Sequence, residues 1–140
     1  MAGCCGSNKA QVTNASCCGS DKKKTVLVYA CSGGANVAEI SDKAARELMF
    51  GGCGTMFCLA GLGAGIAGMI QTAKDADVNL VIDGCPMDCA KKVFEKAGVT
   101  NYAYIRVTDL GIEKVKGIRC KDEQVAKVVA KARDVLAALE

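Results

Sequence analysis

Histidine and tryptophan are both absent from this sequence of 140 residues. Without an imidazole, the chain has no histidine general base, no serine–histidine catalytic pair and no histidine metal ligand. Aromatic residues are scarce, with three tyrosines and three phenylalanines, so small and branched aliphatic side chains must fill the core. The ten cysteines are the side chains left for metal or redox chemistry.

Excess charge is also absent from most of the chain. The formal net charge is +3, but the four lysines and one aspartate within residues 1–24 account for all of it. The remaining residues are neutral overall, with 14 basic and 14 acidic side chains. Nucleic-acid-binding proteins need a basic face and stacking aromatic rings, so the sequence predicts no nucleic-acid partner.

Long apolar runs are missing too. The sequence has no stretch of 18 apolar residues, and its beginning lacks the apolar core of a signal peptide. We therefore expect no membrane partner and a cytoplasmic location, where cysteines are kept reduced. In that compartment, clustered cysteines indicate metal binding or redox chemistry more than structural disulfides.

The first 24 residues differ in composition from the rest. The sequence CCGS occurs at 4–7 and again at 17–20, among small polar residues and lysines. So few large apolar side chains cannot offset the entropy of ordering, and we expect a disordered cysteine-rich tail over residues 1–24. The paired cysteines are either incidental or an arm for soft metal ions, which prefer sulfur ligands. Residues 25–140 are predicted to form a zinc-binding α/β domain.

From residue 25 onward, apolar patterns typical of β-strands alternate with patterns typical of α-helices. Alternation with short connections predicts a parallel sheet covered by helices on both faces. We expect a single-domain, three-layer α-β-α fold of the Rossmann-like or flavodoxin-like type, with strand order 2-1-3-4. Ligands of such sheets bind beyond the carboxyl ends of the strands, at the switch between strands 1 and 3. The expected strands are 25–30, 55–60, 78–83 and 102–109, and the expected helices are 37–50, 61–76, 86–98 and 123–140.

Three of the predicted strands end close to a cysteine. Cys31 follows the first strand, Cys58 lies near the end of the second, and Cys85 follows the third. Parallel strands lie about 4.8 Å apart, and sulfurs bound to one tetrahedral zinc lie at a similar spacing. With Cys89 added from the following helix, the sequence predicts a zinc site at this edge of the sheet.

The pair Cys85 and Cys89 is expected at the start of that helix, with Pro86 in its first turn. Residues four apart share a helix face, and the N–H groups of a helix start favour thiolates. Buried free cysteines are the plainer alternative. Cys53 either replaces one ligand or is incidental, and Cys120 is expected to take no part.

Several ordered motifs resemble one known family. YACSGGANVAEISDKAAREL, MFCLAGLGAGIAGMI, IDGCPMDCAKK and RVTDLGIEK are similar to the proteins named for their Asp-Gly-Cys (DGC) motif, over about residues 25–135. The resemblance implies a small prokaryotic protein with four characteristic cysteines proposed as zinc ligands. They match Cys31, Cys58, Cys85 and Cys89, whereas the cysteine-rich tail lies outside the family pattern. The family supplies a ligand, but no defined reaction.

Two other motifs compete with this interpretation. Gly63, Gly65 and Gly68 spell GxGxxG, with Asp83 twenty residues beyond Gly63, as in a dinucleotide-binding fingerprint. The motif follows the second strand rather than the first, and close packing explains the glycines as well. The stretch beginning at Cys31 also resembles the phosphate loop of low-molecular-weight tyrosine phosphatases and arsenate reductases, but it lacks their arginine.

Two aspartates near the same edge have ordinary and functional interpretations. Asp83 either orients backbone N–H groups beside the cysteine pair or simply begins the following helix, the commoner role. Asp109 either caps a turn or lines the pocket.

The predicted function is metal binding, and whether the protein is an enzyme stays open. Four cysteine ligands would close the site, for a structural or metal-handling role, whereas three would leave a position for a substrate. The alternative is a thiol redox enzyme or an Fe–S carrier that uses the same cysteines, because four thiolates also suit an Fe–S cluster.

Overall fold

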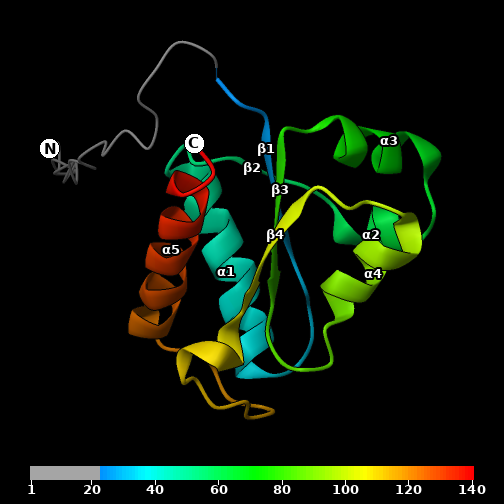
Figure 1. Cartoon of the computed structure of the whole chain (residues 1–140). Coiled ribbons are helices and arrows are strands. Elements are labelled where there is room, and N and C mark those ends of the chain that lie inside the picture. The colour runs from blue at the N-terminus through cyan, green and yellow to red at the C-terminus, as the bar shows by residue number, and fades with distance from the viewer. Residues whose placement is uncertain (1–22) are drawn as a thin grey trace, which may run out of the picture.

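The computed structural model describes residues 23–140, and four parallel strands form its sheet in the order β2-β1-β3-β4 (Figure 1). This confirms the predicted α/β class and strand order. The tail predicted for residues 1–24 falls almost entirely outside the described residues. The strands are β1 (Val26–Ala30), β2 (Thr55–Met56), β3 (Val78–Asp83) and β4 (Tyr102–Arg106).

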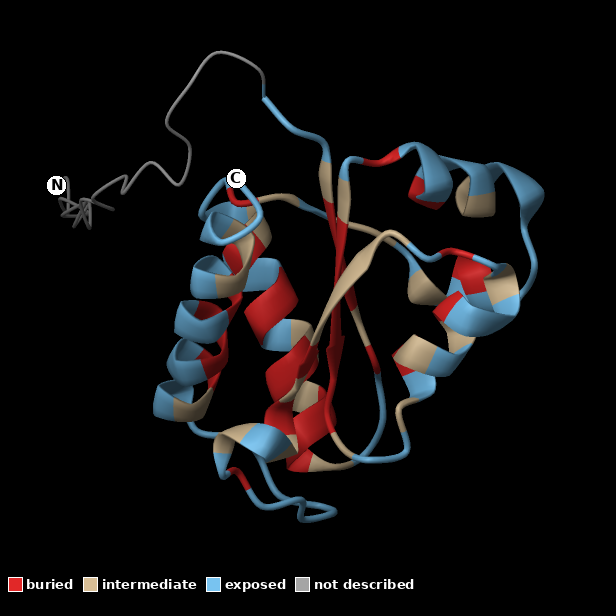
Figure 2. Cartoon of the chain, viewed as in Figure 1, coloured by how far each residue is buried: buried red, intermediate tan, exposed pale blue. Residues whose placement is uncertain are grey.

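The helices lie on both faces of the sheet and make two cores (Figure 1). One core packs the sheet against α1 (Asn36–Phe50) and α5 (Asp122–Ala137). The other packs it against α2 (Leu59–Gly63), α3 (Ala67–Asp75) and α4 (Cys89–Ala97). Buried residues face the sheet from both layers (Figure 2). No helix within residues 23–140 is long and apolar enough to cross a membrane.

The second strand is shorter than predicted, and the helix after it is divided. β2 has only two residues, and Cys58 is the N-cap of α2 rather than part of a strand. α2 therefore includes the last two residues of the predicted strand, and its Leu62 is buried in the core that also contains residues of α4. Gly65, with a φ of +74°, provides the turn between α2 and α3.

Two other predicted boundaries are also wrong. α4 begins at Cys89, so Pro86 lies in the preceding turn and not in the helix. β4 ends at Arg106, and the short 3₁₀ helix η1 (Val107–Leu110) follows it. Gly98 ends α4 in the left-handed conformation, with a φ of +69°, as expected for a helix-terminating glycine.

Candidate thiol site at the carboxyl edge of the sheet

The structure places all four predicted ligands after the carboxyl ends of strands. Cys31 directly follows β1, and Cys58 lies two residues beyond β2. Cys85 lies two residues beyond β3, and Cys89 begins α4. Since β1 and β3 are neighbours and their following helices cover opposite faces, the cysteines surround the topological switch point, where ligands of such sheets bind.

Their side chains do not point into one space. Cys31 is buried in the core on the side of α2, α3 and α4. Cys85 is half-buried and packs against the core on the opposite face of the sheet, where its sulfur lies 3.3 Å from the Lys114 ammonium. Cys58 and Cys89 are exposed. The shared edge is therefore divided between the two faces of the sheet.

The four cysteines, as they are arranged, do not form a ready metal site. Within residues 23–140, no group of three or more Cys, Asp or Glu side chains is arranged so that it could hold a metal ion. The expectation that Cys85 and Cys89 share a helix face is wrong, because Cys85 precedes α4 and Asp88 is its N-cap. Zinc binding would require the exposed cysteines and Cys85 to turn toward Cys31.

The thiol of Cys31 already takes part in a hydrogen-bond chain. It accepts the Gly84 N–H at 3.1 Å and lies 3.7 Å from the Ser41 hydroxyl oxygen, to which its S–H can donate. Ser41 in turn donates to the Val37 carbonyl at 2.9 Å. Burial raises the pKa of Cys31 above its ordinary value, Ser41 and Gly84 oppose that rise, and the charges of Asp83 and Cys89 add to it. Cys31 is therefore held as a neutral thiol.

Asp83 and Gly84 of the Asp-Gly-Cys tripeptide have separate structural roles. Both carboxylate oxygens of Asp83 accept backbone N–H groups at the start of α4, from Ala90 at 2.9 Å and Lys91 at 3.0 Å. Asp83 thus fixes the beginning of the helix, the commoner of its two expected roles. A Cβ atom at Gly84 would lie 2.9 Å from the backbone of Val37 in α1, so only glycine fits without a shift.

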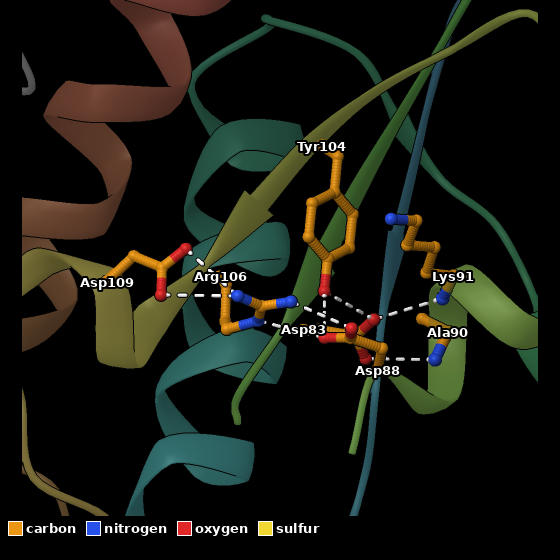
Figure 3. A network of polar contacts seen from close by, with 7 residues as sticks. All are labelled: Asp83, Asp88, Ala90, Lys91, Tyr104, Arg106 and Asp109. Carbon is orange, nitrogen blue, oxygen red and sulfur yellow. Dashed lines mark hydrogen bonds and ion pairs between the residues drawn. The ribbon is translucent and has the colours of Figure 1, made fainter. Parts of the chain in front are cut away.

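A network of polar contacts connects the loop between β3 and α4 to the end of β4 (Figure 3). The Tyr104 hydroxyl lies 3.1 Å from Asp83 and 2.7 Å from Asp88. Arg106 donates to both oxygens of Asp88, at 2.8 and 2.7 Å, and more weakly to Asp109 at 3.3–3.4 Å. Hydrogen bonds from Tyr104 and then Arg106 lower the pKa of Asp88.

Asp88, which contacts both Tyr104 and Arg106 in this network, has an unusual backbone conformation. It is the single residue other than glycine with a positive φ among those described, at +53°, a region that aspartate tolerates better than most residues. The network was missed from the sequence, because Asp88 meets its partners from another strand. Asp109, expected to cap a turn or line the pocket, is instead an outer partner of Arg106.

The remaining motif residues do not form the sites that their patterns suggested. Cys53 is buried just before β2, at the opposite edge of the parallel sheet. Cys120 precedes α5, and its N–H donates to the Glu39 carboxylate at 2.8 Å. The GxGxxG glycines extend from the end of α2 into α3 rather than from a strand into a helix. This is not the setting of a dinucleotide-binding loop.

Comparison with known proteins agrees with the sequence motifs. The DGC domain, a family named for its Asp-Gly-Cys motif, matches residues 27–132. The chain is also similar to the "Anaerobic and virulence modulator AnvM" of Pseudomonas aeruginosa, at 28% identity over 110 residues. That alignment covers 79% of this chain and 84% of the relative. No solved structure matches the chain significantly.

Proposed function

Because the chain belongs to the DGC-domain family, we propose that it is a zinc-binding protein whose ligands are Cys31, Cys58, Cys85 and Cys89. The observation that carries the proposal is the convergence of three strand ends and one helix start at the same edge. Four thiolates would enclose the ion, which suits metal storage, transfer or a structural role.

Burial disfavours the thiolate form of Cys31, but nearby groups of the chain would stabilise thiolates at this place once a cation is bound. The Gly84 N–H, already directed at the Cys31 sulfur, would remain as a donor to a thiolate, and hydrogen bonds to ionised acceptors are the stronger kind. Lys114 lies beside Cys85 and opposes the negative charge that several thiolates would gather. Zinc supplies a cation that favours the deprotonated thiols. Cys58 and Cys89 are exposed and can turn without disturbing the core.

A thiol redox function is the second candidate, and a different observation favours it. Cys58 and Cys89 are exposed, and Cys85 lies next to a lysine, which is the environment of a reactive cysteine. The relative's name, an anaerobic and virulence modulator, fits either a metal-dependent or an oxidation-dependent protein. An Fe–S cluster on the same cysteines would be a third use of the site.

Metal analysis tests the first candidate most directly. The full chain is prepared with Cys4, Cys5, Cys17 and Cys18 replaced by serine, so that the remaining cysteines are those of the α/β domain. After zinc loading under reducing, anaerobic conditions and removal of loose metal, we expect colourless protein with about one zinc per chain. Cys58→Ser and Cys89→Ser should each weaken zinc binding in a chelator competition, while Cys120→Ser should not.

The same preparation separates the alternatives. Brown protein with visible absorption would indicate an Fe–S cluster. Protein that binds no zinc, yet loses two free thiols to a mild disulfide oxidant, would support the redox candidate and overturn the proposal. Zinc binding that survives each of the serine substitutions at Cys31, Cys58, Cys85 and Cys89 would overturn the ligand set.

A further inference from the structure

A pocket with a volume of about 300 Å³ lies between α4 and the pair α2 and α3. One side is formed by Cys89, Lys92, Val93, Lys96 and Ala97, which recur at the spacing of a single helix face. With a rise of 1.5 Å per residue, this face is about 12 Å long. The lining residues on α4 therefore extend along about two turns of the helix, and Cys89 is the first of them.

The opposite side of the pocket is apolar. Leu62 from α2 and Ile70 from α3 face Val93 across it. Gly63 and Gly65 complete the lining, and a Cβ atom added at Gly63 would lie 3.7 Å from the Val93 side chain. A larger side chain at this position would fill the space. The GxGxxG stretch therefore keeps a pocket open without forming a phosphate-binding loop.

The charge of the pocket has one sign. Lys92 and Lys96 line it, and no aspartate or glutamate does. Within residues 23–140, no carboxylate lies within ion-pair distance of either ammonium group. A local charge of +2 is notable because residues 25–140 are neutral overall. Small-molecule pockets combine an apolar lining with a few polar groups that orient the ligand.

We propose that this pocket binds an elongated aliphatic carboxylate. The apolar body lies against Leu62 and Val93, the carboxylate lies between Lys92 and Lys96, and one end of the ligand covers Cys89. The size and apolar lining favour such a molecule over a nucleotide, and the two lysines favour an anion over a neutral or cationic lipid. This site goes beyond the proposed function, because ligand binding here requires no metal.

Protection of Cys89 from alkylation tests the proposal. The full chain is kept metal-free with a chelator and treated with iodoacetamide, which is uncharged, and modification of each cysteine is followed by mass spectrometry. We expect octanoate to slow alkylation of Cys89 in a saturable manner and to leave Cys120, which lies outside the pocket, unchanged. Acetate, which lacks the apolar body, and octylamine, which carries the opposite charge, should protect far less.

Charge variants give the matched control. In the double variant Lys92→Glu, Lys96→Glu, the octanoate concentration that gives half-protection should rise about tenfold or more, since two exposed ion pairs become two repulsions. Lys131→Glu, on an exposed face of α5, should leave it unchanged. Protection by octylamine equal to that by octanoate, an equal loss in Lys131→Glu, or no protection by octanoate would overturn the proposal. Zinc binding is decided separately, by the metal analysis of the preceding subsection.

Discussion

Arg106 and Asp88 form a bidentate ion pair, with Nε of Arg106 2.8 Å from Oδ1 of Asp88 and Nη2 2.7 Å from Oδ2. Asp88 is the N-cap of α4, while Arg106 is the last residue of β4. The pair therefore fastens the loop that carries Cys85 to the neighbouring strand. Because both side chains are mostly shielded from water, at 17% and 23% exposure, this contact is stronger than an ordinary surface ion pair.

Asp88→Asn should lower the free energy of unfolding by about 1.5–3 kcal/mol, the range for hydrogen bonds to charged groups. Asparagine also tolerates a positive φ, so the change removes the charge without adding backbone strain. Chemical denaturation followed by circular dichroism measures the effect. Asp109→Asn is the matched control, because its carboxylate is 60% exposed and contacts the same arginine at 3.3 Å. Equal losses in the two variants would contradict a special role for Asp88.

The lowered pKa of Asp88 predicts a pH dependence with a definite sign. A carboxyl whose native pKa lies below its unfolded value stabilises the fold fully above that unfolded value, about 3.9 for aspartate. The stabilisation is then lost as the pH falls through the native pKa. Urea unfolding between about pH 5 and pH 2 should therefore show a steeper loss in the wild type than in Asp88→Asn. Glu39, whose pKa is also lowered, mainly by the Cys120 backbone N–H, affects both proteins alike. Parallel curves would exclude Asp88 as the source.

The sequence was sufficient for most of the sheet because β1, β3 and β4 each have a local signal. The runs around Val28 and Leu80 are continuous and apolar, and alternation with helices then requires parallel pairing. The position of the cysteines after the strands followed from the same reasoning. Cys58 was placed less well, because β2 has only two residues and Cys58 is the N-cap of the helix that follows it.

The orientation of the cysteines could not be obtained in the same way. Which face of the sheet Cys85 packs against depends on the turn from Gly84 to Asp88, and that turn is fixed by Tyr104 and Arg106 from another strand. Such contacts join residues 16 and 18 positions apart. The spacing of two cysteines carries no information about these contacts. The expectation that Cys85 and Cys89 share a helix face was therefore wrong, whereas the cysteines do lie at the carboxyl edge of the sheet, as expected.

Two tyrosines should respond in opposite ways to the same substitution. The Tyr29 hydroxyl is buried and has no hydrogen-bond partner among the described residues, and burial raises its pKa. Its ring packs edge-on against Phe57 and Phe94. Tyr29→Phe removes an unpaired polar group and keeps the ring, so we expect unchanged or higher stability.

Tyr104→Phe removes hydrogen bonds to Asp83 and Asp88 and should cost about 1.5–3 kcal/mol. The denaturant midpoints of the two variants, measured side by side, should show a lower midpoint for Tyr104→Phe than for Tyr29→Phe. A larger loss for Tyr29→Phe than for Tyr104→Phe would mean that Tyr29 has a partner not seen among the side chains.

The glycine of the Asp-Gly-Cys tripeptide should be sensitive to substitution. A Cβ at Gly84 would lie 2.9 Å from the Val37 carbonyl carbon and 3.0 Å from its oxygen, and backbone atoms cannot move aside as a side chain can. Gly84→Ala should therefore reduce stability by about 1–3 kcal/mol, as overpacking does. Gly34→Ala is the control, because nothing lies within 4 Å of its added Cβ.

The same substitution should also change the reactivity of Cys31. A displaced Gly84 would withdraw the N–H that lies 3.1 Å from the Cys31 sulfur and would open the buried thiol to solvent. Alkylation of Cys31, slow in the wild type because the residue is buried, should become faster in Gly84→Ala and remain slow in Gly34→Ala. If Gly84→Ala is as stable as the wild type and Cys31 stays protected, the close approach of Gly84 to Val37 in α1 is not what requires glycine in the motif.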